Sequence, residues 1–180
     1  MPDKYNAQEL TNLLRQNPEV ALEYLFQNYY TLVSQIIFRI VPHRSTTEDL
    51  AQEVFYELWR KRKHLVFTTS PEAYLKKSAR NKSLNYLRDQ RWYLQDAPLP
   101  ILPDQRPPIT QEMAADELQR EVDHLIDQLP ERCRLIFVLS RFHDMTYQEI
   151  ADDLGISRKT VENQLSKALR QLRKGLDPYL

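Results

Sequence analysis

Apolar side chains recur every three or four residues along most of this chain, which is the spacing of one face of an α-helix. In the first half one such pattern begins at Leu22 and stops at Pro42, a residue that ends helices. Another follows Ser45, and Glu48 comes three residues later, which is the spacing of a capping box. The predicted apolar positions are Leu22, Phe26, Tyr29, Val33, Ile36, Ile37 and Ile40 in the first helix, and Leu50, Ala51, Val54, Phe55, Leu58 and Trp59 in the second.

A third helix is predicted to begin at Ser70, which suits the N-cap, with Pro71 at the first helical position and Glu72 in the first turn. We expect it to run to about Trp92. Its predicted buried side chains are Tyr74, Leu75, Ala79 and Leu87. Its other face is basic and polar, with Lys76, Lys77, Arg80, Asn81, Lys82, Asn85 and Arg88. These three helices predict a small helical bundle.

The second half begins another helical pattern near Ala114. Apolar residues recur from Leu118 to Leu129 and stop at Pro130, and a further apolar run covers residues 135–139. Cys133, next to that run, is expected to fill core space.

Residues 145–172, MTYQEIADDLGISRKTVENQLSKALRQL, predict two short helices that meet at a corner. Thr146 suits the N-cap of the first helix, and Gly155 supplies the left-handed residue that ends it. Ser157 caps the second helix. Inward positions are predicted at Ile150, Ala151 and Leu154 in the first helix, and at Val161, Leu165, Leu169 and Leu172 in the second. Two helices joined by a tight glycine turn form a helix-turn-helix.

The second helix of this corner carries polar side chains where it would be exposed, and such a helix fits the major groove of DNA. Arg and Lys read guanine there, Asn and Gln read adenine, and Glu accepts from cytosine. The predicted DNA-facing residues are Ser157, Arg158, Lys159, Thr160, Glu162, Asn163, Gln164, Ser166 and Lys167. An ordinary helical hairpin within a bundle is the alternative.

The composition agrees with an all-α chain, because the 180 residues include only two glycines. A single cysteine excludes an internal disulfide, and the four histidines lack the spacing of metal ligands. We therefore expect no metal and no cofactor. No stretch approaches the roughly 20 apolar residues that cross a bilayer, and no signal peptide is evident, so we expect a cytoplasmic protein without membrane insertion.

Prolines divide the chain, because five of the eleven lie between Pro98 and Pro108. Proline removes backbone donors and restricts the residue before it, so this stretch cannot be helical. We predict an N-terminal helical domain over residues 1–92, a proline-rich linker over 93–113 and a C-terminal helix-turn-helix domain over 114–180.

The net charge of zero conceals an uneven distribution. Residues 56–92 carry ten basic and three acidic groups, whereas residues 93–131 carry two and nine. Residues 132–180 are again mildly basic, with nine basic and six acidic groups. Two basic parts separated by an acidic one indicate two surfaces that face a polyanion. Solvated basic helix faces are the simpler interpretation of either one alone.

The motifs in combination resemble a known family. The stretch from LPERCRLIFVLSRF through the corner is similar to the promoter-reading C-terminal domain of sigma-70-type transcription initiation factors. The stretch EDLAQEVFYELWRK, followed by SPEAYLKKSARNKSLNYLRDQ, resembles their N-terminal core module. This order, with only a proline-rich acidic linker between, resembles the short extracytoplasmic-function (ECF) class.

The resemblance implies three surfaces. The clamp helices of RNA polymerase would bind Asp49, Gln52 and Glu53. The −10 promoter element would bind Lys77, Arg80, Asn81, Asn85 and Arg88, with an unstacked base held between Asn81 and the loop over residues 66–69. The corner's second helix would read the −35 element, although Glu162 stands where many members carry a basic residue.

The implied partners are core RNA polymerase, through its clamp helices and flap, promoter DNA and an anti-sigma factor. A conventional helix-turn-helix regulator with a helical sensor domain is the alternative function. It would need a ligand pocket or a dimer interface, and the sequence shows no long heptad seam. We expect no enzyme, because the chain has no glycine-rich phosphate loop, nucleophile elbow or pair of histidine and carboxylate on a helix face.

Overall fold

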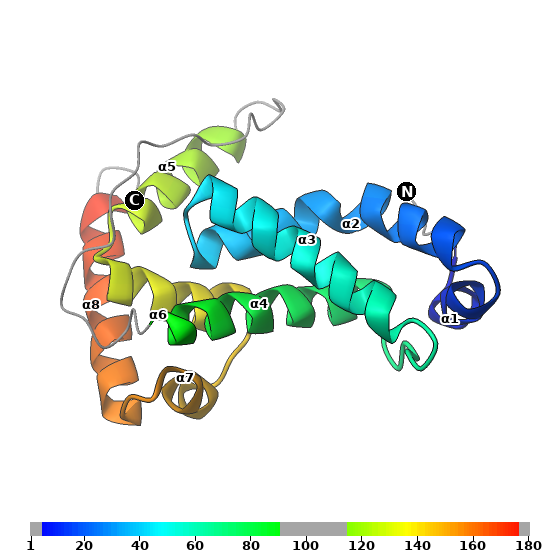
Figure 1. Ribbon diagram of the computed structural model, residues 1–180. Coiled ribbons are helices and arrows are strands. Elements are labelled where there is room, and N and C mark those ends of the chain that lie inside the picture. The colour runs from blue at the N-terminus through cyan, green and yellow to red at the C-terminus, as the bar shows by residue number, and fades with distance from the viewer. Residues whose placement is uncertain (1–4, 91–114, 177–180) are drawn as a thin grey trace. The chain divides into compact units, whose positions relative to one another are not determined.

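The computed structural model describes residues 5–90 and 115–176. In the second of these ranges, side chains are described from residue 121 onward. These ranges form eight helices and no strand (Figure 1), so the all-α prediction is confirmed. The chain divides into two compact units, Met1–Gln90 and Arg91–Leu180. The predicted linker over residues 93–113 lies outside the described residues.

The first unit consists of α1 (Ala7–Gln16), α2 (Pro18–Ile40), α3 (Arg44–Lys61) and α4 (Pro71–Asp89). The long helix α2 packs against the other three, and α3 also packs against α4. The core between them is aliphatic, and its fully buried side chains include Leu25, Val33, Ile37, Leu58, Leu75 and Leu87. Sequence patterning missed α1, which begins with a capping box between Asn6 and Glu9.

Two expectations for this unit were wrong. Phe26 was predicted to be buried, but 42% of it is exposed. Helix α3 is capped by His43, whose Nδ1 accepts from the amide of Thr46, so Ser45 is not the N-cap. Glu48 instead pairs with Arg44 at 3.1 Å.

The start of α4 agrees with prediction, because the Ser70 hydroxyl accepts from the amide of Ala73 and Pro71 occupies the first turn. The helix ends at Asp89, and the predicted end at Trp92 lies outside the described residues. Leu75, Ala79 and Leu87 are buried as expected, whereas Tyr74 is half-buried.

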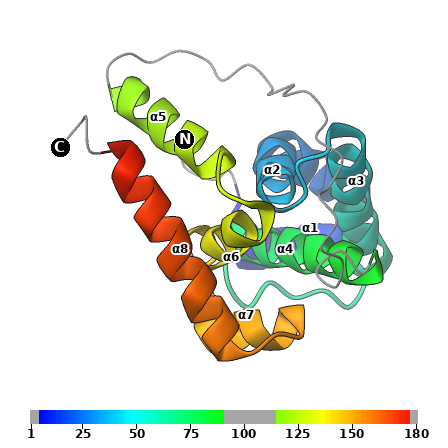
Figure 2. The same ribbon diagram turned by 90° about the vertical axis from the view of Figure 1, so that its left-hand side faces the viewer.

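The second unit consists of α5 (Ala115–Asp127), α6 (Glu131–Phe142), α7 (Tyr147–Leu154) and α8 (Arg158–Leu176). Helix α8 packs against the other three. In Figure 2, α7 lies near the start of α8 and α5 near its end. A Cβ added to Gly175 would lie 2.3 Å from Leu125 Cδ2, so this glycine permits the close approach of α5 to α8.

The core of this unit includes Cys133, Leu139, Ile150 and Val161, whose exposed fraction is 0%. One predicted inward position was wrong, because Leu169 is 47% exposed and Ala168 is buried in its place. The remaining inward positions of α8, at Val161, Leu165 and Leu172, are confirmed.

Candidate nucleic-acid interface

The corner between α7 and α8 has the geometry that the sequence predicted. Thr146 and Glu149 form a capping box at the start of α7, and Gly155 ends it in the left-handed conformation, with φ 63° and ψ 33°. The amide of Thr160 donates to the Ser157 hydroxyl at 3.0 Å, which caps α8. Ile150 and Leu154 are buried against α8. The result is a helix-turn-helix with a fixed angle between its helices.

Ser157 and the first three turns of α8 carry the predicted polar side chains. Those fully on the surface are Ser157, Arg158, Lys159, Thr160, Asn163, Ser166 and Lys167. Glu162 is half-buried and pairs with Arg158 at 3.3 Å and Lys159 at 3.4 Å. The carboxylate therefore partly neutralises two cations on the face that would meet DNA.

Gln164 differs from the rest of the predicted set. It is half-buried, and its Oε1 accepts from the Cys133 thiol of α6 at 2.7 Å. Burial raises the pKa of the Cys133 thiol, and the charge of Lys167 opposes that shift. The neutral thiol remains the donor, so Gln164 ties α8 to α6. No spacing rule in the sequence could have paired two residues on different helices.

Helix α4 carries the second basic surface. Lys77, Asn81, Asn85 and Arg88 are exposed and recur every three or four residues, so they lie on one face of the helix. Arg80 is half-buried beside them. The buried sequence of Leu75, Ala79 and Leu87 holds the opposite face against α2. The five predicted residues therefore share one helix, with four of them openly accessible.

The loop before α4 is anchored at its centre. The Phe67 amide donates to Thr11 Oγ1 at 3.2 Å, and its ring packs edge-on against Tyr74 with 5.5 Å between centroids. The adjacent Val66, Thr68 and Thr69 are exposed. The buried Phe67 therefore holds the loop near α4, while the neighbouring loop residues stay accessible to solvent.

The polar side of α3 carries Asp49, Gln52 and Glu53, and all three are exposed. Their helix is anchored on its other side by Leu50, Val54 and Leu58. Glu53 Oε2 lies 2.6 Å from Lys82 Nζ of α4. The structure thus joins the polar side of α3 to the edge of the basic surface of α4.

Sequence reasoning missed an apolar groove between α2 and α3. Its lining is Leu22, Phe26, Phe55, Tyr56 and Trp59, together with Glu19, Glu23, Gln27 and Gln52. The Phe26 and Phe55 rings lie 5.1 Å apart, and Tyr56 is 63% exposed. The available signal was Tyr56, an aromatic residue outside the apolar stripe of its helix.

Among residues 5–90 and 115–176, there is no group of three or more His, Cys, Asp or Glu that could hold a metal ion. None of the helices described there has both the length and the apolar character needed to cross a membrane.

Family models match both units. The model for sigma-70 region 2 matches residues 25–93, and the model for sigma-70 region 4 matches residues 119–172. The chain belongs to the sigma-70 family of transcription initiation factors. The two models match in the family's order, one in each unit, so the resemblance inferred from the motifs is confirmed.

Curated relatives extend the match over nearly the whole chain. RNA polymerase sigma-H factor of Pseudomonas aeruginosa is 26% identical over 96% of this chain and 95% of its own. ECF RNA polymerase sigma factor SigX of Bacillus subtilis is 25% identical over 88% of this chain and 85% of its own. These matches confirm the expected ECF class.

A solved structure supports the fold. The sigma factor RpoE from Bartonella quintana, crystallised with the anti-sigma factor NepR, matches with a TM-score of 0.52 and 17% identity. The match covers 86% of this chain and 95% of that one.

Proposed function

We propose that this chain is an ECF sigma factor, which binds core RNA polymerase, directs it to specific promoters and helps to open their −10 region. The observation that carries the proposal is the occurrence of both sigma-70 regions in one chain, each in its own helical unit. A conventional regulator would need a helix-turn-helix and a sensor domain, but it would not need sigma-70 region 2. The match of the first unit to region 2 therefore favours the sigma function over that alternative.

The two units divide the work between three surfaces. Asp49, Gln52 and Glu53 on α3 bind the clamp helices of the polymerase, where an acidic surface complements a basic partner. Helix α8 enters the major groove at the −35 element, because its exposed donors match base edges there. The flap of core RNA polymerase is a further contact that we assign to this chain.

The basic face of α4 binds the −10 element. Lys77, Arg80 and Arg88 attract phosphates, while Asn81 and Asn85 offer amide groups that can hydrogen-bond a base. The loop over residues 66–69 is fixed beside this helix through Phe67, and it holds the base that leaves the stack. An unstacked base costs a few kcal/mol, which these contacts recover.

The neutral total charge has a physical role in this function. DNA affinity falls with salt by roughly one power of its concentration for each phosphate that is neutralised. A factor with weak DNA affinity of its own leaves promoters unoccupied until polymerase arrives. The acidic residues between 93 and 131 contribute to that restraint.

An anti-sigma factor is the regulatory partner that we assign to this chain. The matched sigma factor from Bartonella quintana was crystallised with one. The site of action is the cytoplasm, where RNA polymerase and the chromosome are found, and the chain acts by binding, without catalysis of its own.

Transcription from a library of promoter sequences by core polymerase, with and without this chain, tests the proposal. We expect transcripts from a small set of related promoters that appear only when both proteins are present. Core polymerase alone and the chain alone are the controls. An unchanged transcript set on addition of the chain contradicts the proposed function.

A further inference from the structure

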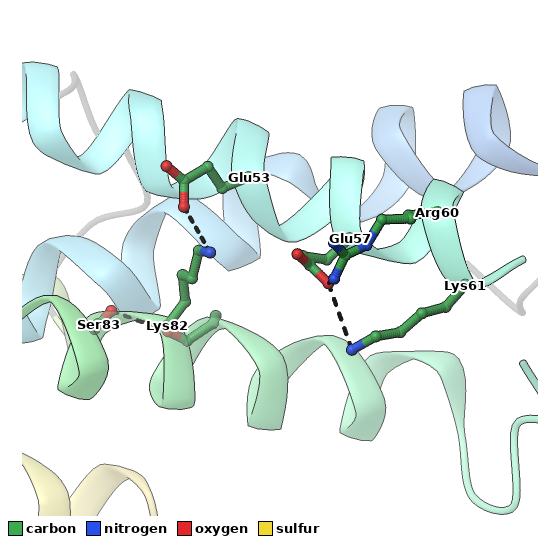
Figure 3. A network of polar contacts seen from close by, with 7 residues as sticks. Glu53, Glu57, Arg60, Lys61, Lys82 and Ser83 are labelled. Carbon is green, nitrogen blue, oxygen red and sulfur yellow. Dashed lines mark hydrogen bonds and ion pairs between the residues drawn. The ribbon is translucent and has the colours of Figure 1, made fainter.

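One ion pair connects the two surfaces of the first unit that we assign to different partners. Lys82 of α4 places its Nζ 2.6 Å from Oε2 of Glu53 on α3, as Figure 3 shows. By contrast, Glu57 on the same side of α3 pairs within its own helix, with Arg60 at 2.8 Å and Lys61 at 3.5 Å. The Glu53–Lys82 pair is therefore a link between helices, whereas the Glu57 pairs are local.

Lys82 lies at the border of the basic surface of α4. It precedes Asn85 by three residues, so these two side chains are neighbours on the helix surface. Its side chain is 29% exposed, and that of Glu53 is 54% exposed. A lysine carries its charge on a flexible four-carbon stem, so it can move from a carboxylate to a nearby phosphate.

The backbone beneath Lys82 is held in place. The neighbouring Ser83 is fully buried, and its hydroxyl donates to the carbonyl of Ala79 at 2.9 Å (Figure 3). Leu84 and Leu87 are also buried in the core of this unit. Transfer of the Lys82 charge to a new partner therefore needs only a movement of its side chain.

We propose that Lys82 is a phosphate contact for the separated strand of an opened promoter, and that Glu53 neutralises it until polymerase binds Glu53. The inference rests on the proposed function, which assigns Glu53 to the polymerase and α4 to the −10 region. Each step follows from charge. A carboxylate 2.6 Å away competes with phosphate for the ammonium group, and a basic polymerase surface draws that carboxylate away.

Binding of polymerase and binding of DNA are then coupled through one pair of side chains. Such coupling is reciprocal, so DNA on Lys82 also favours polymerase on Glu53. The expected size is set by the strength of exposed ion pairs, which corresponds to about a three- to fivefold change in affinity. Without polymerase, this chain would consequently bind single-stranded DNA more weakly than it would if Lys82 were not paired with Glu53.

A double-mutant cycle on the full chain tests the coupling. Anisotropy of a fluorescein-labelled oligo-dT strand reports affinity for phosphates without a requirement for a known promoter. We expect Glu53→Gln to tighten binding about three- to fivefold. Its salt dependence should also become steeper by about 0.7, the value for one additional phosphate contact on a single strand. Lys82→Gln should remove this gain when combined with Glu53→Gln, yet change the affinity little by itself.

Glu19→Gln is the matched control for overall charge. Glu19 is exposed on α2 and makes no ion pair within the described residues, so its replacement removes the same charge without releasing a cation. We expect Glu19→Gln to raise the affinity for the oligo-dT strand by less than half as much as Glu53→Gln does. Equal gains from the two variants overturn the proposal, as does equal behaviour of Glu53→Gln and the parent.

Holoenzyme supplies the second measurement. With saturating core polymerase, Lys82→Gln should slow promoter opening about three- to fivefold, because Lys82 is then available to the strand. Opening at the parental rate overturns the proposal. If the parent binds core polymerase but the effects of Glu53→Gln and Lys82→Gln on oligo-dT affinity are additive, the proposed coupling is wrong and the proposed function stands. If the parent does not bind core polymerase, the proposed function itself fails.

Discussion

At the scale of single residues, two positions with positive φ shape the turns before and after α7. Gly155 has φ 63°, in the left-handed region where a Cβ meets the following carbonyl. Asp144, before α7, has φ 50°, and a short polar side chain tolerates that region better than most. The glycine was recognisable from its place after an apolar repeat. The aspartate was not, because many loop residues could have taken that conformation.

We expect Gly155→Ala to destabilise the second unit by about 1–2 kcal/mol, the cost of a left-handed residue with a Cβ. Urea unfolding followed by circular dichroism measures this change in the free energy of unfolding. Gln171→Ala, an exposed change in α8, is the control and should lie within about 0.5 kcal/mol of the parent. Equal stability of the two variants would show that the turn adapts at no cost.

At the scale of helices, local capping rules identified three helix starts correctly. Ser70 with Pro71, Thr146 and Ser157 were identified as starts, and the structure confirms all three regions. The rule failed at α3, where the ring nitrogen of His43 takes the role expected of Ser45. Histidine accepts there only as one tautomer, so sequence statistics seldom place it at an N-cap.

Contacts between helices explain the remaining differences. The α8 stripe shifts from the predicted Leu169 to Ala168, because the packing surface offered by three different helices sets which side of α8 is covered. Phe26 is exposed because it lines the groove between α2 and α3. The Cys133–Gln164 and Glu53–Lys82 contacts likewise depend on tertiary structure. The spacing of apolar residues along a single sequence does not predict such side-chain pairs between helices.

Base reading by α8 predicts a local loss of specificity. Asn163→Ala should cost about 1–3 kcal/mol at one or two positions of the −35 element and relax the preference there. The measurement is transcription by holoenzyme from promoters randomised at −35. Gln171→Ala, farther along the exposed side of α8, should retain the parental preferences. A uniform reduction across all −35 sequences would identify Asn163 as a phosphate contact instead.

Strand opening by α4 predicts a difference between two templates. Asn81→Ala should reduce transcription from intact duplex more than from a template already melted at −10, because the melted template does not require a base to be unstacked. The expected difference corresponds to a few kcal/mol at most. Rates of open-complex formation on the two templates measure it. Equal losses on both would assign Asn81 to folding or to a phosphate.

At the scale of the whole molecule, charge is unevenly distributed although it sums to zero. The acidic residues of α3 and the basic residues of α4 belong to adjacent helices, and Glu53–Lys82 joins them. Glu53 is a poor position for a charge reversal that tests polymerase binding, because Glu53→Lys would also place like charges together at Lys82. Asp49 is exposed one turn earlier and makes no ion pair within the part of the chain that the structure describes, so it gives a simpler charge reversal.

Binding of Asp49→Lys to core polymerase tests the central claim most directly. An exposed substitution changes stability by less than about 0.5 kcal/mol, whereas like charges at an interface cost several kcal/mol. We expect parental circular dichroism and melting temperature, with core binding and promoter-specific transcription almost lost. The control is Asp89→Lys, the same reversal at the exposed end of α4, which should retain core binding. Parental core binding and initiation by Asp49→Lys would contradict the assignment of α3 to the polymerase.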